Sequence, residues 1–207
     1  MQCFLDSAVP CSMLLNIAHV MRDSLDKAKS NDKLSLMFIF FDGEEAFVEW
    51  TATDSIYGAR HLAKKWEDEE FLHRIDMLML LDLLGSSDPQ FYSLNPETMN
   101  WYMRLSDTEH KLSHAGLLDR YTTSGVTKAK NPNPYFNQYS IQTFIEDDHK
   151  PFMERNVPVL HLIPVPFPPV WHKFDDDRSA IDDVTCENLM KVFRIFITEY
   201  LHLNVDD

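Results

Sequence analysis

The sequence is poor in positive charge. Its 207 residues contain 19 Lys and Arg against 33 Asp and Glu, which gives a formal net charge of −14. A surface of this kind repels phosphate backbones, so nucleic acids are unsuitable partners. Neutral or cationic peptides suit it better. The length fits one domain, or a little more, and allows a substantial buried core.

Long apolar runs are also missing, and no stretch reaches transmembrane length. The residues around Asp6 lack the pattern of a signal peptide. Only three cysteines are present, Cys3, Cys11 and Cys186, and none has a metal-binding spacing. Three is an odd number, so at least one thiol is unpaired in a monomer. A Cys3–Cys11 disulfide is one possibility, and cysteine usage leaves the compartment open.

Three short apolar runs, 34–41, 75–85 and 157–163, have the composition of strands buried on both faces. Helical spacing predicts helices at about 10–25, 54–67, 96–114 and 183–203, the first capped by Asp6 or Ser7. Residues 116–139 are predicted to form a long loop. The alternation of strands and helices indicates an α/β sandwich around a mixed sheet.

Ionisable residues accompany each predicted strand, and in such folds ligands bind beyond the carboxyl ends of the strands. The first strand leads into Asp42-Gly43-Glu44-Glu45, and the second contains Asp82 near its end. Glu146-Asp147-Asp148-His149 precedes the third strand, and Trp171-His172 follows it after a proline-rich loop. This coincidence is the strongest functional feature of the residues themselves.

Each feature alone also has an ordinary structural explanation. Charged turns are usually solvated loops, which covers the Glu44-Glu45 doublet. Asp82 needs a partner because burying a lone carboxylate is costly. That partner is as often a set of backbone amides, which would make Asp82 structural, as a bound ligand. His161 is more often a satisfied core histidine than a ligand. The run 175–177 is expected to be solvated surface, and Trp171 beside His172 a packing residue.

Together, the ionisable residues predict a hydrolase-like metal site. Catalytic zinc takes three nitrogen and oxygen ligands from the protein and keeps one position open. Adjacent glutamates on a turn point in different directions. One of them can therefore bind the metal while the other faces the open position as a general base.

Several long motifs closely resemble the glutaminyl-peptide cyclotransferases, and the resemblance covers nearly the whole chain apart from residues 119–140. The matching segments are 6–11, 40–47 with Trp50, 54–62, 80–85, 146–152, 157–164, 167–168, 170–172 and 199–201. The resemblance implies a three-layer, zinc-exopeptidase-like α/β fold with a mixed, mostly parallel central sheet. It also implies one catalytic zinc ion.

The resemblance implies a role for each of eleven residues. The zinc ligands would be Asp6, Glu45 and His172. Glu44 would transfer protons beside a hydrogen-bonded acidic pair, Asp82 and Asp147. The residues expected to bind the substrate are Trp50, Glu146, His161, Phe167 and Trp171.

The implied reaction closes the N-terminal glutamine of peptides and proteins into pyroglutamate and releases ammonia. No membrane span is expected in this chain, and the resemblance implies the secretory pathway, either secretion or the Golgi. Residues 1–207 are expected to form a single catalytic zinc domain without its N-terminal portion. Family members carry a sheet strand there, whose cysteine would pair with Cys11; Cys3 is a substitute partner.

Two rival readings stay open. A zinc aminopeptidase of the same fold would use two metals, with Asp82 as a ligand of the second. The Glu-Asp-Asp-His motif, Phe167 and the Trp171-His172 pair favour cyclisation instead. The other rival is an inactive truncated paralogue that binds a peptide or metal without turnover.

Overall fold

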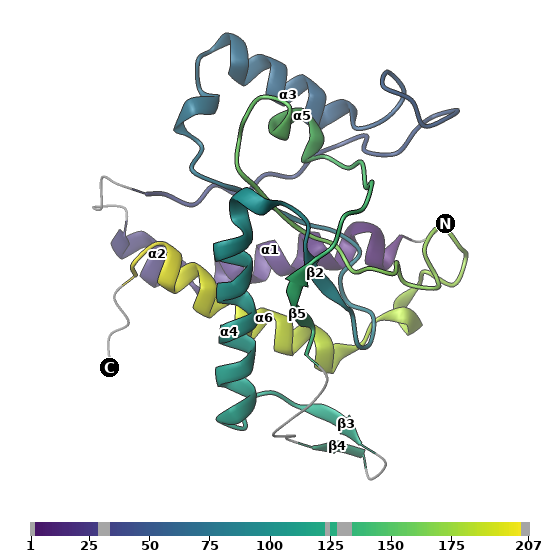
Figure 1. Cartoon of the computed structure of the whole chain (residues 1–207). Helices are drawn as coiled ribbons and strands as arrows, with labels where there is room; N and C mark the ends of the chain where they lie inside the picture. The colour runs from purple at the N-terminus through teal and green to yellow at the C-terminus, as the bar shows by residue number, and fades with distance from the viewer. Residues whose placement is uncertain (1–2, 29–33, 123–124, 128–133, 204–207) are drawn as a thin grey trace.

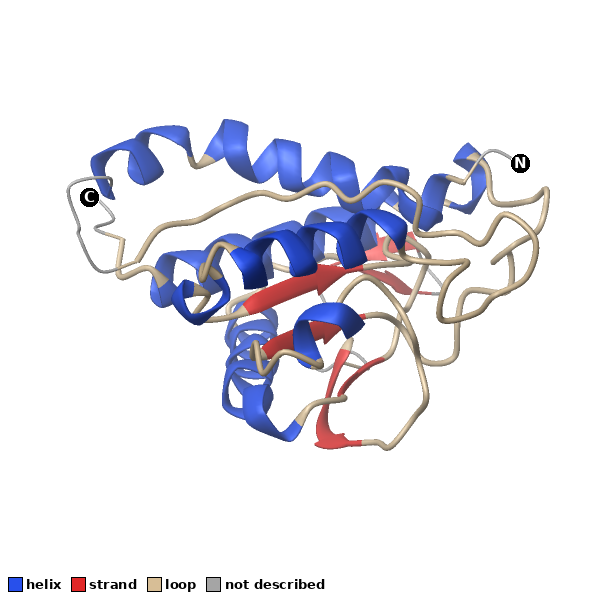
Figure 2. Cartoon of the chain, turned by 90° about the horizontal axis from the view of Figure 1, so that it is seen from above, coloured by secondary structure: helices blue, strands red, loops and turns tan. Residues whose placement is uncertain are grey.

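Helices and short strands alternate along the chain in a computed structural model that describes residues 3–28, 34–122, 125–127 and 134–203. Figure 1 shows their arrangement, and Figure 2 shows the same chain from above. The α-helices are α1 (Val9–Val20), α2 (Arg22–Ala28), α3 (Tyr57–Asp68), α4 (Met99–His114), α5 (Lys150–Met153) and α6 (Asp183–Tyr200). The strands are β1 (Leu78–Leu81), β2 (Phe91–Ser93), β3 (Arg120–Thr122), β4 (Gly125–Thr127), β5 (Phe136–Ser140) and β6 (Val159–Leu162). Single turns are η1 (Phe4–Ala8), η2 (Leu72–Arg74), η3 (Pro96–Thr98) and η4 (Arg178–Ala180).

The centre of the fold is the parallel pair β1 and β6, in which Leu78 lies opposite Val159 and Leu81 opposite Leu162. Successive side chains of a strand point to opposite faces. Leu160 and Leu162 accordingly join a core built largely from α1, α4 and α6. Leu78 and Val159 join a second core with α3 and α5. In Figure 1, α3 and α5 lie at the top and α1 and α6 lower. The predicted layered α/β architecture is confirmed.

Two predicted strands and four predicted helices are found close to their expected positions. The run 75–85 contains β1 and the run 157–163 contains β6. The predicted helices correspond to α1 with α2, to α3, to η3 with α4, and to α6. Short apolar runs and helical spacing are thus sufficient to place these elements.

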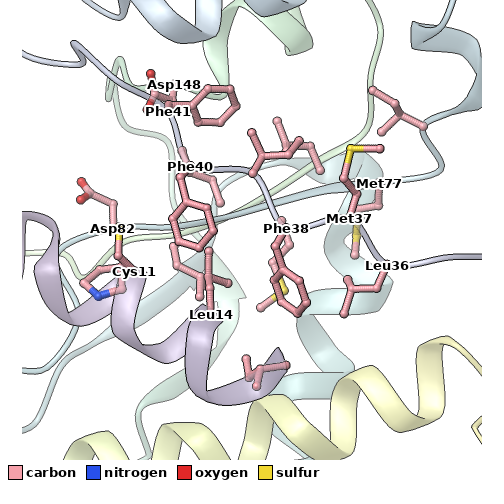
Figure 3. A pocket seen from close by; sticks show the side chains of 18 of the residues that line it. Cys11, Leu14, Leu36, Met37, Phe38, Phe40, Phe41, Met77, Asp82 and Asp148 are labelled. Carbon is pink, nitrogen blue, oxygen red and sulfur yellow. The ribbon is translucent and has the colours of Figure 1, made fainter. Parts of the chain in front are cut away.

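The prediction of a strand at 34–41 is wrong for this structure. These residues run without assigned helix or strand, and Met37 and Phe40 are exposed by 56% and 49%. They form one wall of a groove of about 1130 Å³ whose other walls include β1, α1 and α6 (Figure 3). A strand is defined by ladder hydrogen bonds. Within the described residues, β1 pairs with β6 and with no other strand, so segment 34–41 has no neighbouring strand to pair with.

The predicted long loop at 116–139 is wrong in part. It includes the antiparallel hairpin β3–β4 and the start of β5, which pairs in parallel with β2. Residues 123–124 and 128–133 lie outside the described part. A buried carboxylate stabilises β5: Glu109 of α4 accepts hydrogen bonds from the backbone N–H groups of Tyr135 and Phe136 at 2.8–3.0 Å. This long-range contact cannot be read from local composition.

The prediction that Asp6 or Ser7 caps the first helix is also wrong. The cap of α1 is Ala8, without a side-chain hydrogen bond. All three cysteines are free, so the possible Cys3–Cys11 disulfide is not formed. No single helix among the described residues is long and apolar enough to cross a membrane, and the bent pair Phe4–Val20 and Arg22–Ala28 passes that test by length and composition only.

Candidate active site

The acidic turn that follows segment 34–41 is attached to the start of α3. Backbone N–H groups of Ile56, Tyr57 and Gly58 donate to the carbonyls of Glu44, Gly43 and Asp42 at 2.7, 2.8 and 2.9 Å. A side chain at Gly58 would collide with the backbone of Asp42, so glycine permits this close approach. These contacts fix where the turn presents its two glutamates.

Three segments distant in sequence bring Asp6, Glu45 and His172 together. One ligand atom from each lies within 4.8 Å of the other two. His172 Nε2 is 2.8 Å from Glu45 Oε1 and 3.6 Å from Asp6 Oδ2. The segment before Asp6 is held by Asp176, whose Oδ1 accepts the backbone N–H of Leu5 at 2.8 Å. Asp176 is buried, so the prediction that run 175–177 is solvated surface is wrong for this residue.

The donors of this cluster fit a zinc ion. One imidazole nitrogen and two carboxylates are a usual catalytic ligand set, and zinc then keeps an open position. Glu45 and His172 are exposed, so a ligand can reach that position. Burial, followed by the charge of Glu45, raises the pKa of the Asp6 carboxyl to about 6. Such crowding of acidic groups is what a cation relieves.

Next to the cluster is a group of carboxylates formed by Glu44, Asp82 and Asp147. Burial raises the pKa of Glu44 to about 9, and the charges of Asp147, Asp148 and Asp82 add to the effect. Burial also raises the pKa of Asp82, which accepts a hydrogen bond from the Ser7 hydroxyl at 2.8 Å. Carboxylates this close cannot all be charged at low cost, so some of them share protons.

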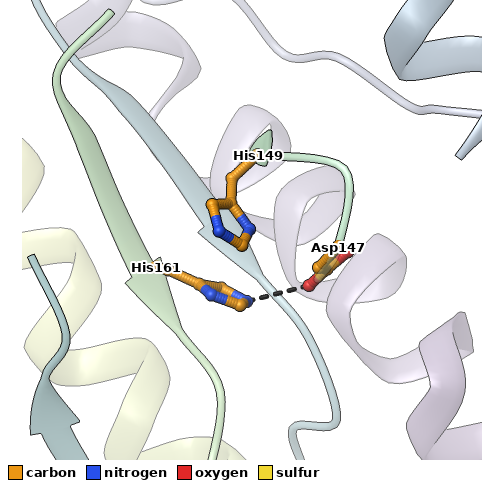
Figure 4. A group of neighbouring side chains, drawn as sticks. All are labelled: Asp147, His149 and His161. Carbon is orange, nitrogen blue, oxygen red and sulfur yellow. Dashed lines mark hydrogen bonds and ion pairs between the residues drawn. The ribbon is translucent and has the colours of Figure 1, made fainter. Parts of the chain in front are cut away.

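Figure 4 shows a second, buried cluster of Asp147, His149 and His161. His161 Nε2 lies 2.8 Å from Asp147 Oδ2, and the two imidazole rings are 4.3 Å apart. Burial alone would raise the pKa of Asp147, but the hydrogen bond and charge of His161 lower it overall. Burial, followed by the charge of His161, lowers the pKa of His149 to about 3.

Both clusters have three ligand atoms within metal-binding reach. They differ in access, because all three residues of the second cluster are buried. His161 and Asp147 also satisfy one another there by their hydrogen bond. The exposed cluster of Asp6, Glu45 and His172 is therefore the one suited to a catalytic ion that must meet a peptide.

The aromatic residues expected at the substrate pocket form three contacts. Trp50 Nε1 donates to Glu146 Oε2 at 3.0 Å. Phe167 packs edge-on against Trp171, with ring centroids 4.8 Å apart, and Trp171 stacks on the His172 ring at 4.1 Å. Indole rings thus lie beside both Glu146 and the His172 imidazole.

Some residues of the site are missed by sequence reasoning. Asp54 accepts the backbone N–H groups of Phe47, Val48 and Glu49 at 2.8–3.0 Å and so shapes the loop that carries Trp50. An aspartate shortly after a polar loop is a usable signal for such a turn. Ser7 and Asp176 give no comparable signal, because their partners lie far away in sequence.

Comparison with known proteins gives consistent matches. The model of peptidase family M28 matches residues 3–197. The chain is 58% identical over 197 residues to a glutaminyl-peptide cyclotransferase of Drosophila melanogaster, covering 95% of this chain and 55% of that protein. It is 44% identical over 211 residues to the Bos taurus enzyme of the same name, covering 96% and 56%.

Solved structures agree with these matches. The glutaminyl cyclase of Macrostomum lignano aligns with a TM-score of 0.86 at 37% identity, covering 99% of this chain and 64% of that one. The Porphyromonas gingivalis glutaminyl cyclase, at 16% identity and a TM-score of 0.63, shares the fold. The chain therefore spans a little over half the length of the curated relatives it matches.

Proposed function

We propose that this chain, which belongs to peptidase family M28, carries the active site of a zinc-dependent glutaminyl-peptide cyclotransferase. The observation that carries the proposal is that two adjacent glutamates have different partners. Glu45 contacts His172 at 2.8 Å, while Glu44 lies among the carboxylates Asp82 and Asp147. The similarity to named cyclotransferases over 95–96% of the chain supports the choice of reaction.

Asp6, Glu45 and His172 are the residues that would hold the metal. A zinc ion held there would polarise the γ-carboxamide oxygen of an N-terminal glutamine. The protein itself supplies geometry, since the α-amine and the carboxamide belong to one residue and need only be held in a reactive arrangement. Trp50, Phe167 and Trp171 offer flat apolar surfaces for the glutamine side chain, and Glu146 holds the Trp50 indole.

Glu44 transfers the proton in this proposal. The neutral α-amine attacks the amide carbon, a C–N bond forms, and the carboxylate form of Glu44, which a cation at the neighbouring cluster would favour, accepts the amine proton. Glu44 then returns the proton to the departing nitrogen, which leaves as ammonia when its C–N bond breaks. Asp147 stabilises the nitrogen during the transfer, and His161 holds Asp147 in place by its hydrogen bond. The products are pyroglutamate and ammonia, and no water is consumed.

Mass spectrometry of a peptide with N-terminal glutamine, incubated with this 207-residue chain and zinc, tests the proposal. Loss of ammonia above the uncatalysed rate is the expected result. Loss of the whole glutamine residue would instead identify an aminopeptidase. An unchanged peptide despite bound zinc would indicate a binding protein without turnover, and this outcome would overturn the proposal for the chain as given.

Two further parts of the proposal rest on family resemblance. Residues 1–207 act as one catalytic zinc domain, and the protein works on peptides and proteins in the secretory pathway. Fractionation of cells that express the protein would locate it. Recovery in the cytosol alone would contradict the secretory placement and leave the proposed reaction unaffected.

A further inference from the structure

Two histidines lie beside each other on the solvent-facing side of α4, outside both clusters described above. His110 and His114 are four residues apart and exposed, and the centroids of their imidazole rings are 4.4 Å apart. Residues at this spacing are neighbours on the surface of a helix. Glu109, Leu112 and Ser113 of the same turns are buried, so the two rings share the side that faces water. The helix is the long one in front in Figure 1.

The two imidazoles have no protein partner that would explain why they lie together. Among the residues that the structure describes, no hydrogen bond or ion pair involves the ring of His110 or His114. A neutral imidazole keeps one nitrogen with a free lone pair, so the pair offers two nitrogen ligands on one side of the helix. Two histidines at this spacing on one helix face are an arrangement that holds a divalent metal.

The charges around the pair favour a cation. His114 is the last residue of α4, and the end of a helix carries partial negative charge from carbonyl groups without a partner in the helix. Asp107 is exposed and lies three residues before His110, which places it on the same stripe. Lys111, next to His110, carries the opposite charge. The whole chain nevertheless has a net charge of −14, which attracts cations.

The ligand type decides which class of ion suits the pair. Imidazole suits zinc, copper and nickel, whereas Mg²⁺ and Ca²⁺ prefer oxygen ligands. Nickel and copper also accept a square-planar arrangement, in which two neighbouring nitrogens leave the other positions to water. The pair has one ligand fewer than the proposed zinc site of Asp6, Glu45 and His172, and it has no carboxylate. Zinc is therefore expected to fill the three-residue site first.

We propose that His110 and His114 form a separate metal site, which chelates one divalent ion of the nickel and copper class on the surface of α4. Once one imidazole holds the ion, the second binds it intramolecularly, so the pair binds far more tightly than either residue alone. The ion then links two successive turns of the helix. It thereby restrains the last turn of α4 against fraying.

Titration with NiCl₂, followed by isothermal calorimetry, tests the proposal. Nickel is the probe because copper would also oxidise the exposed thiol of Cys11. The measurements use the His172→Ala chain, from which the imidazole of the proposed zinc site has been removed. One equivalent of Ni²⁺ is expected to bind. Adding His110→Ala or His114→Ala should weaken the affinity by at least about tenfold.

Hydrogen exchange shows where the ion binds. The backbone N–H groups of Ala115 and Leu117 donate to the carbonyls of Lys111 and Leu112 at the end of α4. Exchange at these two amides should slow by about tenfold or more when Ni²⁺ is added, because the ion holds the last turn closed. The same amides should not respond to Ni²⁺ in the chain with His110→Ala.

Two further variants serve as matched controls. His114→Ala combined with Ala115→His keeps the number of histidines but puts the two imidazoles five residues apart, on different sides of the helix. It should bind as weakly as the single variants. His61→Ala removes an exposed histidine of α3 that does not belong to the pair, and it should bind as tightly as the parent chain. Circular dichroism checks that each variant is folded.

Three results would overturn the proposal. One is the absence of Ni²⁺ binding by the folded His172→Ala chain. Another is an affinity that stays within about twofold after His110→Ala or in the variant with the altered spacing, because scattered surface groups would then hold the ion. The third is a slowing of exchange elsewhere in the chain and not at the end of α4. None of these readouts measures turnover, so failure here leaves the proposed reaction standing.

Discussion

At the scale of single residues, the two adjacent glutamates have different partners and hence different expected roles. Glu45 lies 2.8 Å from the His172 imidazole, whereas Glu44 faces other carboxylates. We expect Glu44→Gln to lower kcat by about 100-fold or more, the usual contribution of a general base, while zinc binding is retained. Turnover assays and metal analysis of the purified variant measure both quantities.

Glu49→Gln is the matched control for this prediction, because Glu49 is an exposed glutamate of the same loop. It should change neither turnover nor metal content. Loss of zinc from Glu44→Gln, with zinc retained by Glu45→Gln, would mean that the two assignments are reversed.

His149 makes the stability of the protein depend on pH, because it is buried in a neutral form. Burial, followed by the charge of His161, lowers its pKa to about 3, against about 6.5 for an unperturbed histidine. The unfolded chain therefore binds this proton more tightly than the folded one. The stabilisation is fully present above pH ~6.5 and is lost as the pH falls towards 3.

We expect the free energy of unfolding to fall, through His149 alone, by about 1.4 kcal/mol for each pH unit between roughly pH 6 and 4. Urea unfolding of the wild type and of His149→Gln at several pH values measures it as the difference between the two curves. Asp148 has the opposite effect, because burial raises its pKa to about 7, but it is present in both proteins. His19→Gln, on an exposed face of α1, should retain the wild-type slope.

At the scale of elements, β5 depends on a contact from a helix. Glu109 of α4 accepts the N–H groups of Tyr135 and Phe136, and all three residues are buried. Glu109→Ala leaves these two donors without this acceptor, and each unsatisfied donor costs about 1–3 kcal/mol. We expect the free energy of unfolding to fall by at least about 2 kcal/mol, measured by urea denaturation.

Asp107→Ala is the control for that loss, since Asp107 is an exposed carboxylate of the same helix. It should lie within about 0.5 kcal/mol of the wild type. An equal loss in both variants would show that α4 depends on charge along the helix and not on the attachment of β5.

The elements also show which features local sequence can predict. Helical spacing and apolar runs locate α4, α6, β1 and β6, because these elements bury their own side chains. Segment 34–41 has the same apolar character but no strand beside it, and pairing depends on a neighbour that composition does not specify. β5 is the reverse case: a largely polar stretch just after Pro134 becomes a strand through β2 and Glu109. The acidic positions at the strand ends are predictable, whereas partners such as Ser7 and Asp176 emerge only from packing.

At the scale of the whole molecule, the cluster proposed to bind zinc exists only when distant segments are folded together. Asp6, Glu45 and His172 come from the start, the first quarter and the last fifth of the chain. Zinc that binds this arrangement and not the unfolded chain raises stability by about 2.7 kcal/mol at a free concentration of 100 times Kd. For a protein of this size, that corresponds to an increase in Tm of about 5–10 °C.

The variants decide which cluster is responsible for that increase. The stabilisation by zinc in thermal unfolding should disappear in His172→Ala and Glu45→Gln. It should persist in His149→Gln, because His149 belongs to the buried cluster and ligates nothing in the proposed site. The opposite pattern, with zinc stabilising His172→Ala but not His149→Gln, would place the metal between Asp147, His149 and His161. A chelator is expected to reverse the increase in the wild type, since the proposed site is open to solvent.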